Sequence, residues 1–155
     1  MIRIILILLI LPIKALALIE VDITRGNLNP LPIAVSPLSI DENSRKNFEK
    51  ILKKKNIGSE ISLVVENNLK ISRLFNPLNK DAFLQAPDIA NLKPRFEDWN
   101  LIKAQALITG KVNFVDEKLR VEFRLWDVLA GKEMLALAFT TVPNNWRRVG
   151  HIITD

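Results

Sequence analysis

The residues of this 155-residue chain that could do chemistry are few and lie far apart in the sequence. There is one histidine, His151, and no cysteine, whereas nucleophilic catalysis needs a nucleophile within reach of a base. Two acid pairs, at residues 41–42 and 116–117, are neighbours in sequence and cannot flank one substrate bond as the carboxylates of a glycosidase do. We therefore expect no catalytic site, no clustered metal ligands and no cofactor.

Motifs that bind nucleotides or nucleic acids are also missing. Neither a G-x-G-x-x-G fingerprint nor a P-loop occurs. The lysine run at residues 53–55 is typical of a solvated helix face, and Arg147 and Arg148 can pair with helix carbonyls or with another domain. Seven Phe, three Trp and no Tyr are too few aromatics to favour a surface that stacks bases. The polar residues therefore favour protein binding over catalysis.

The N-terminus has the pattern of a secretory signal peptide. A basic start precedes an apolar run over residues 4–13, and the small residues Ala15 and Ala17 follow. The run is about half of the ~20 residues that a membrane-spanning helix needs. An uncleaved membrane anchor is the alternative, but Lys14 closes the run too early for a span. We expect cleavage after Ala17, export, and no stable membrane insertion.

Removal of residues 1–17 leaves 138 residues and takes away two basic residues and no acid, so the formal charge falls from +5 to +3. A chain of this length can form one domain with its own core. Because it has no cysteine, burial alone must stabilise it outside the cytoplasm.

The elements that would position a binding site follow from hydrophobic periodicity. Residues 18–24 alternate with period two and predict a strand, followed by a turn and a second strand over residues 32–38. Two helices are expected next, capped by Asp41 or Asn43 and by Ser59. Residues 87–94 are expected to form a loop, and a short helix should carry Phe96, Trp99 and Ile102.

The C-terminal part predicts three antiparallel strands at residues 104–115, 119–126 and 133–142. In the middle strand Leu119, Val121, Phe123 and Leu125 should point inward. Pro143 then opens a helix that has not ended at Asp155. The expected fold is α/β (α+β), with a mixed β-sheet and helices packed on one face.

Four segments resemble the TolB family. Residues 18–35 read Leu-Ile-Glu-Val-Asp-Ile-Thr-Arg-Gly-Asn-Leu-Asn-Pro-Leu-Pro-Ile-Ala-Val, similar to the start of the mature family domain. Residues 69–78 are similar to a helix end of the family, with Arg73 where glycine is usual. Residues 125–128 and 142–155 are the closest match, and the similarity is densest in the alphaproteobacterial version of the family.

The resemblance implies a signal peptide at residues 1–17 and a TolB N-terminal domain, similar to anticodon-binding domains, at residues 18–155. The family continues into a six-bladed β-propeller, and this chain stops before it, so we interpret it as a fragment or a truncated product. The implied role is a periplasmic adaptor of the Tol-Pal system, which supports outer-membrane integrity and envelope constriction during division. A Pal-like lipoprotein would be held mainly by the missing propeller.

The resemblance also implies that the mature N-terminus engages a TolA-like periplasmic domain. A terminal strand can add to another sheet through main-chain hydrogen bonds. The expected partner-binding residues are Leu18, Ile19, Glu20, Val21, Asp22, Ile23 and Thr24.

Three alternatives stay open at this point. Residues 18–24 can instead be a first strand paired in the domain's own sheet. The chain can be an exported α/β module that binds a small ligand or nucleic acid, although fold does not carry function. A periplasmic hydrolase fragment is the third, and the missing catalytic residues weaken it.

If the chain is exported and its signal peptide is cleaved, the mature protein should have a defined N-terminus. N-terminal sequencing of the exported protein should begin at Leu18, because the apolar run is too short to anchor the chain and Ala15 and Ala17 fit the cleavage site. Recovery of an intact Met1 from the membrane fraction would contradict this prediction.

Overall fold

A mixed β-sheet forms the centre of the computed structural model, which describes residues 29–155. Its strands are β1 (Leu31–Val35), β2 (Ser39–Ile40), β3 (Phe75–Pro77), β4 (Ala106–Val115), β5 (Lys118–Asp127) and β6 (Lys132–Thr141). The order is β3-β1-β4-β5-β6, with β2 paired to β4. Strand β1 runs parallel to β3 and β4, whereas β4, β5 and β6 form an antiparallel meander. The predicted mixed sheet is confirmed.

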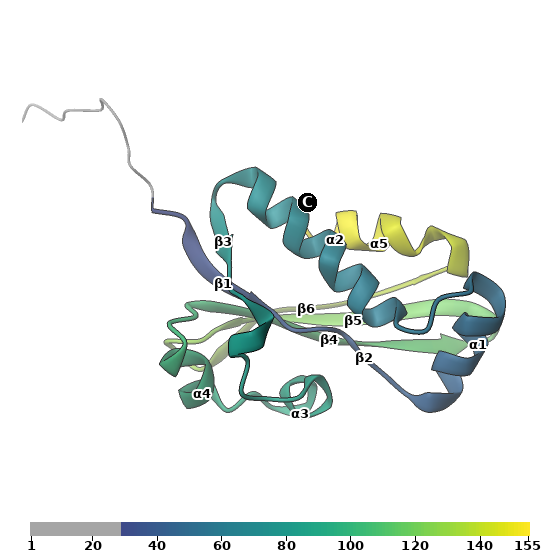
Figure 1. The fold of residues 1–155 in the computed structure, drawn as a ribbon, viewed down its shortest axis with the longest axis horizontal. Coiled ribbons are helices and arrows are strands. Elements are labelled where there is room, and N and C mark those ends of the chain that lie inside the picture. The colour runs from purple at the N-terminus through teal and green to yellow at the C-terminus, as the bar shows by residue number, and fades with distance from the viewer. Residues whose placement is uncertain (1–28) are drawn as a thin grey trace, which may run out of the picture.

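Helices α1 (Glu42–Leu52), α2 (Ile57–Ser72) and α5 (Trp146–Ile152) build the larger core on one face of this sheet. The short helices α3 (Pro87–Leu92) and α4 (Phe96–Leu101) lie on the other side, so that α2 and α5 appear above the sheet and α3 and α4 below it in Figure 1. Two 3-10 turns, η2 (Lys80–Ala82) and η3 (Pro143–Asn145), precede α3 and α5.

The side chains of β5 that were predicted to point inward lie on the face of the sheet that carries α1, α2 and α5. Leu119, Val121 and Phe123 are buried against the helices, and Leu125 is half-buried. The ring of Phe123 stacks on that of Phe139 in β6, with centroids 6.0 Å apart. Burial of one face of β5 therefore joins the meander to the helical layer.

A second, smaller core lies on the opposite face. Trp99 of α4 is buried there with Leu107 of β4 and Val128, and Phe83 meets the Trp99 ring edge-on at 5.0 Å. The β1–β4 half of the sheet is thus covered on both sides, which explains why the chain from η2 to α4 is ordered without long helices.

Three local predictions were wrong. Residues 87–94 contain helix α3, because Pro87 occupies a first-turn position where its missing N–H is no loss. Helix α2 begins at Ile57 rather than after Ser59, with Asn56 preceding it. The last helix ends at Ile152, and the N–H of Ile153 donates to the Val149 carbonyl.

The start of α1 is tied to the sheet through one serine. Asp41 Oδ1 accepts from the Ser44 backbone N–H at 2.9 Å, and Ser44 Oγ donates to Asp41 Oδ2 at 2.6 Å. The same buried hydroxyl accepts from the Phe114 N–H of β4 at 2.8 Å. Hydrogen bonds from the Ser44 side chain and backbone hold the pKa of Asp41 below its ordinary value of 3.8.

Replacement of Phe123 by Ala should lower the free energy of unfolding by about 3–5 kcal/mol, since it leaves a cavity beside Phe139. Urea denaturation measures the effect. The matched control is Leu101→Ala at a side chain that is 74% exposed, which should change stability by less than about 0.5 kcal/mol. An unchanged urea midpoint for the Phe123 variant would refute the assignment of Phe123 to the buried face of β5.

Replacement of Asp41 by Ala should destabilise the domain by about 1 kcal/mol at neutral pH. The folded pKa of Asp41 is depressed, so its contribution is present above pH 3.8 and is lost as the pH falls through the folded pKa. The stability gap between the natural protein and Asp41→Ala should therefore close in acid, as followed by thermal unfolding. Asp41→Asn keeps a capping acceptor that does not titrate, and it serves as the control. If the difference in stability between the natural protein and Asp41→Ala persisted unchanged to pH 2, the result would count against the cap.

Candidate partner interface

The residues predicted to bind a partner precede the described structure. Leu18, Ile19, Glu20, Val21, Asp22, Ile23 and Thr24, and the cleavage residues Ala15 and Ala17, lie outside residues 29–155. Their role stays a prediction, and the described residues inform it only through the strand that follows.

Strand β1 follows that segment and has both of its edges occupied. It pairs with β3 on one side and β4 on the other, and the Leu31 N–H donates to the Leu74 carbonyl at 2.9 Å. Ile33, Ala34 and Val35 are buried. A strand formed by residues 18–24 therefore has no free edge beside the start of β1, and within residues 29–155 the unpaired strand edges are those of β2, β3 and β6.

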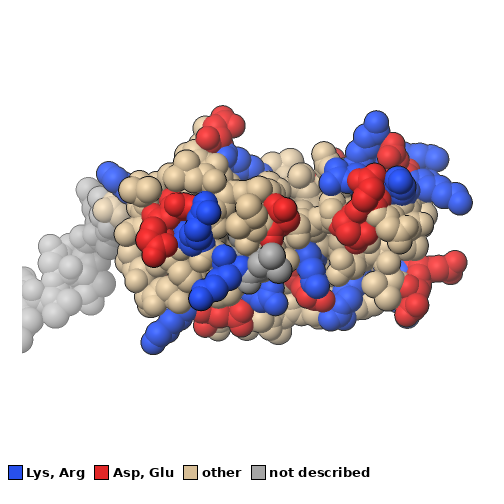
Figure 2. Space-filling model, turned by 90° about the horizontal axis from the view of Figure 1, so that it is seen from below, with Lys and Arg blue, Asp and Glu red and all other residues tan. Residues whose placement is uncertain are grey.

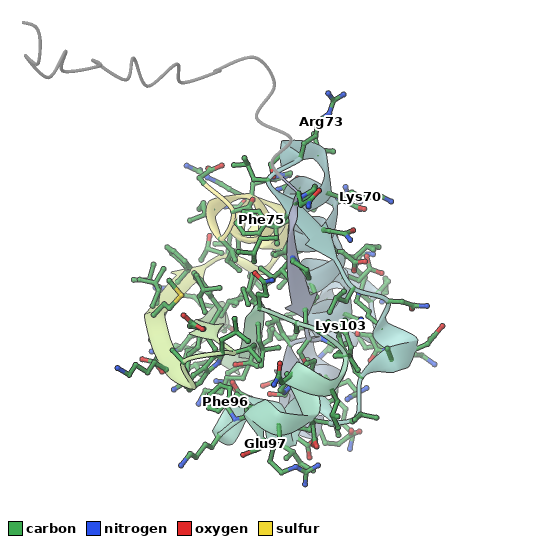
Figure 3. All side chains as sticks on the ribbon, turned by 90° about the vertical axis from the view of Figure 1, so that its left-hand side faces the viewer. Lys70, Arg73, Phe75, Phe96, Glu97 and Lys103 are labelled. Carbon is green, nitrogen blue, oxygen red and sulfur yellow. The ribbon has the colours of Figure 1, made fainter. Side chains whose placement is uncertain are left out.

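The C-terminal end of α2 lies beside the start of β1. Figure 3 shows Lys70, Arg73 and Phe75 together at this end, away from Phe96 and Glu97. Arg73 has φ 61°, the left-handed conformation that glycine adopts easily, and its N–H donates to the Lys70 carbonyl. The helix thus ends in a left-handed cap although Arg73 replaces the glycine usual in the resembled family.

The two outer edges of the sheet differ in length and exposure. Strand β3 has three residues and contains Pro77, which cannot donate to a further strand. Strand β6 has ten residues, most of them exposed. The sequence predicts β6 only as the last strand of the meander, because hydrophobic periodicity does not report the order of strands across a sheet.

Charged side chains form a row on the face of the meander opposite α2 and α5. Glu122 lies 3.3 Å from the Lys111 ammonium and 3.0 Å from Nε of Arg120, and Arg124 pairs with Glu133 at 3.2 Å. Burial alone would raise the pKa of Glu122, but the hydrogen bonds and charges of Arg120 and Lys111 outweigh it and hold that pKa below its ordinary value. Three cations and two carboxylates leave one positive charge in excess.

The other residues singled out by sequence have local partners. Nδ1 of His151 lies 2.9 Å from the Asn68 amide nitrogen, in the contact between α5 and α2. Lys54 pairs with Glu60 at 3.2 Å and lies over the Trp146 ring, 5.1 Å from its centroid. These contacts explain the positions of His151 and Lys54 by packing.

The surface that carries α3 and α4 has no area of one charge sign. Figure 2, which views this side, shows Lys and Arg side chains interspersed with Asp and Glu. Within residues 29–155 no group of three or more His, Cys, Asp or Glu is placed to hold a metal ion. In the same part of the chain, no helix has the length and apolar character of a membrane span.

Residues 19–134 match the model of the TolB amino-terminal domain family. A curated relative, the "Tol-Pal system protein TolB" of Pelagibacter ubique (strain HTCC1062), is 83% identical over 147 residues, which cover 95% of this chain and 33% of the relative. The chain therefore spans about a third of the length of that relative. The match confirms the resemblance seen in the sequence.

A solved structure supports the fold. The crystal structure of TolB from Acinetobacter baumannii superposes with a TM-score of 0.62 at 19% sequence identity, over 81% of this chain and 27% of that one. The arrangement of mixed sheet and helices is thus similar to part of that protein.

Proposed function

The chain belongs to the TolB family, and from this premise we propose that it is a non-enzymatic periplasmic adaptor of a Tol-Pal system. The observation that carries the proposal is the 83% identity to a Tol-Pal system protein over 95% of the chain. The role supports outer-membrane integrity and envelope constriction during division.

Residues 18–24 are the partner-binding element of this proposal. They add as a strand to the periplasmic domain of a TolA-like protein, where main-chain hydrogen bonds supply affinity. The apolar side chains Ile19, Val21 and Ile23 select the partner's groove, and Glu20 and Asp22 lie on the opposite side of the strand. The occupied edges of β1 support this assignment, because they leave the preceding segment without a place beside β1.

A Pal-like lipoprotein is the second partner, held mainly by a propeller that follows this domain in the full-length family. A ligand that favours release of the N-terminal segment would strengthen binding to the TolA-like protein by mass action. The domain studied in isolation from a propeller should lack such control, so its binding should be constitutive.

The test is calorimetric titration of a purified TolA-like periplasmic domain into residues 18–155 and into a chain that starts at Gly26. The shorter chain keeps every described residue, so it should fold and yet lose at least about ten-fold in affinity. Equal affinity of the two chains would place the binding surface elsewhere.

Two controls separate this outcome from other causes. The melting temperatures of the two chains should agree, since the described core is common to both. Titration with duplex or single-stranded DNA should show no salt-sensitive, sub-micromolar binding; such binding would favour a nucleic-acid-binding module instead of an adaptor.

A further inference from the structure

Strand β6 presents a long edge without the usual protection against strand addition. It is the last strand in the order β3-β1-β4-β5-β6, and within residues 29–155 no strand pairs with its outer side. The register shift opposite Leu125 and Trp126 places a bulge at Met134, next to the charged Lys132 and Glu133. The seven residues 135–141 that follow contain no charge and no proline, although natural edges are normally blocked by such residues.

One side of this edge is apolar. Leu135, Leu137 and Phe139 share the face that carries the helices, because they pair with Leu125, Phe123 and Val121. Leu135 and Leu137 are nevertheless 43% and 45% exposed. A shallow hollow of about 160 Å³ continues this side between Phe139 and Ile152 of α5.

The other side of the edge is narrow and basic. Ala136 and Ala138 lie there, and their small side chains leave a hollow of about 220 Å³ that is also lined by two guanidinium groups and one carboxylate of β5, those of Arg120, Arg124 and Glu122. The charged row on this face has one excess positive charge. An acidic side chain on a strand added to β6 would point over these alanines toward the guanidinium groups.

We propose that the outer edge of β6 is a docking site for an extended segment of another protein whose side chains alternate between branched aliphatic and acidic residues. The aliphatic side chains continue the apolar side beyond Leu137, and the acidic side chains enter the hollow over Ala136 and Ala138. Main-chain hydrogen bonds to residues 135–141 supply the affinity, and the two unlike faces set the register. Seven residues of added strand span about 23 Å, so a short segment is sufficient.

The chain's own residues 18–24 alternate in the same way, but they are a poorer occupant. To lie beyond β6 the segment must cross four strand spacings from β1, about 19 Å. The seven Cα–Cα steps from Thr24 to Leu31 reach at most about 25 Å when fully extended. The linker would lose much of its conformational freedom, and the proposed function already engages this segment with a different partner.

The probe is a capped seven-residue peptide in which Val and Glu alternate, titrated into residues 18–155 and followed by NMR. Binding should shift the amide resonances of residues 135–141 and slow their hydrogen exchange. A peptide with Lys in place of Glu should bind at least about ten-fold more weakly, because it brings cations to Arg120 and Arg124. Absence of binding at millimolar peptide, or binding that leaves the β6 amides unchanged, would overturn the proposal.

Substitution at the edge gives a charge test. Ala138→Glu should weaken binding of the Val-Glu peptide about ten-fold and strengthen that of the Val-Lys peptide. Val115→Glu, at an exposed strand position outside β6, is the matched control and should change neither affinity. Equal effects of the two variants would contradict docking at β6.

Two further measurements identify the occupant. If the chain that starts at Gly26 binds the Val-Glu peptide at least about ten-fold more tightly than residues 18–155, the chain's own segment fills the edge and the proposal is overturned. Self-association in light scattering that Ala138→Glu abolishes would assign the edge to a second copy and would overturn it as well. If the protein is a monomer and the two chains bind the Val-Glu peptide with equal affinity, the results support a segment of another protein as the occupant of the edge.

Discussion

The structure depends on the burial of β4 on both of its faces. Ile108 and Val112 point into the core beneath the helices, and Leu107 points into the core around Trp99. Between them the buried Thr109 hydroxyl accepts from the Trp126 indole N–H at 2.9 Å. Strands β1, β2 and β5 all pair with β4, so the parallel and antiparallel halves of the sheet are joined through this one strand.

Close packing at two glycines allows this arrangement. At Gly110 an added Cβ would lie 2.2 Å from the Glu122 carbonyl oxygen, so no larger side chain fits at this position of β4. At Gly150 an added Cβ would lie 2.8 Å from Val64, which shows how closely α5 approaches α2. Because α5 packs on α2, it leaves the apolar residues Leu135 and Leu137 of β6 exposed. The helices therefore cover the apolar face of β6 only in part.

Local chemistry explains which elements were predictable. The alternation of residues 119–125 predicted both the strand and its buried face, since a period of two puts every second side chain on one side. The interruption between the strands predicted at residues 104–115 and 119–126 is a tight turn, where Asp116 and Glu117 have the positive φ angles, 49° and 59°, that a two-residue hairpin requires. Helix α3 was missed because a proline at residue 87 permits either a loop or a first helical turn. That choice depends on the contact of α3 with the sheet, which periodicity does not report.

The sequence by itself determined the family, the class of fold and which catalytic residue patterns it lacks, because these depend on residue identity and short-range spacing. It also supplied the prediction that residues 18–24 bind a partner, which the described residues do not test. Only the tertiary structure decided that β1 has both edges occupied and that, among residues 29–155, no strand pairs with the outer edge of β6, which has one apolar and one basic side. Strand order joins residues far apart in the chain, such as Ile33 with Ala106 and Phe123 with Leu137, and such pairing is set by packing of the whole core rather than by any local pattern.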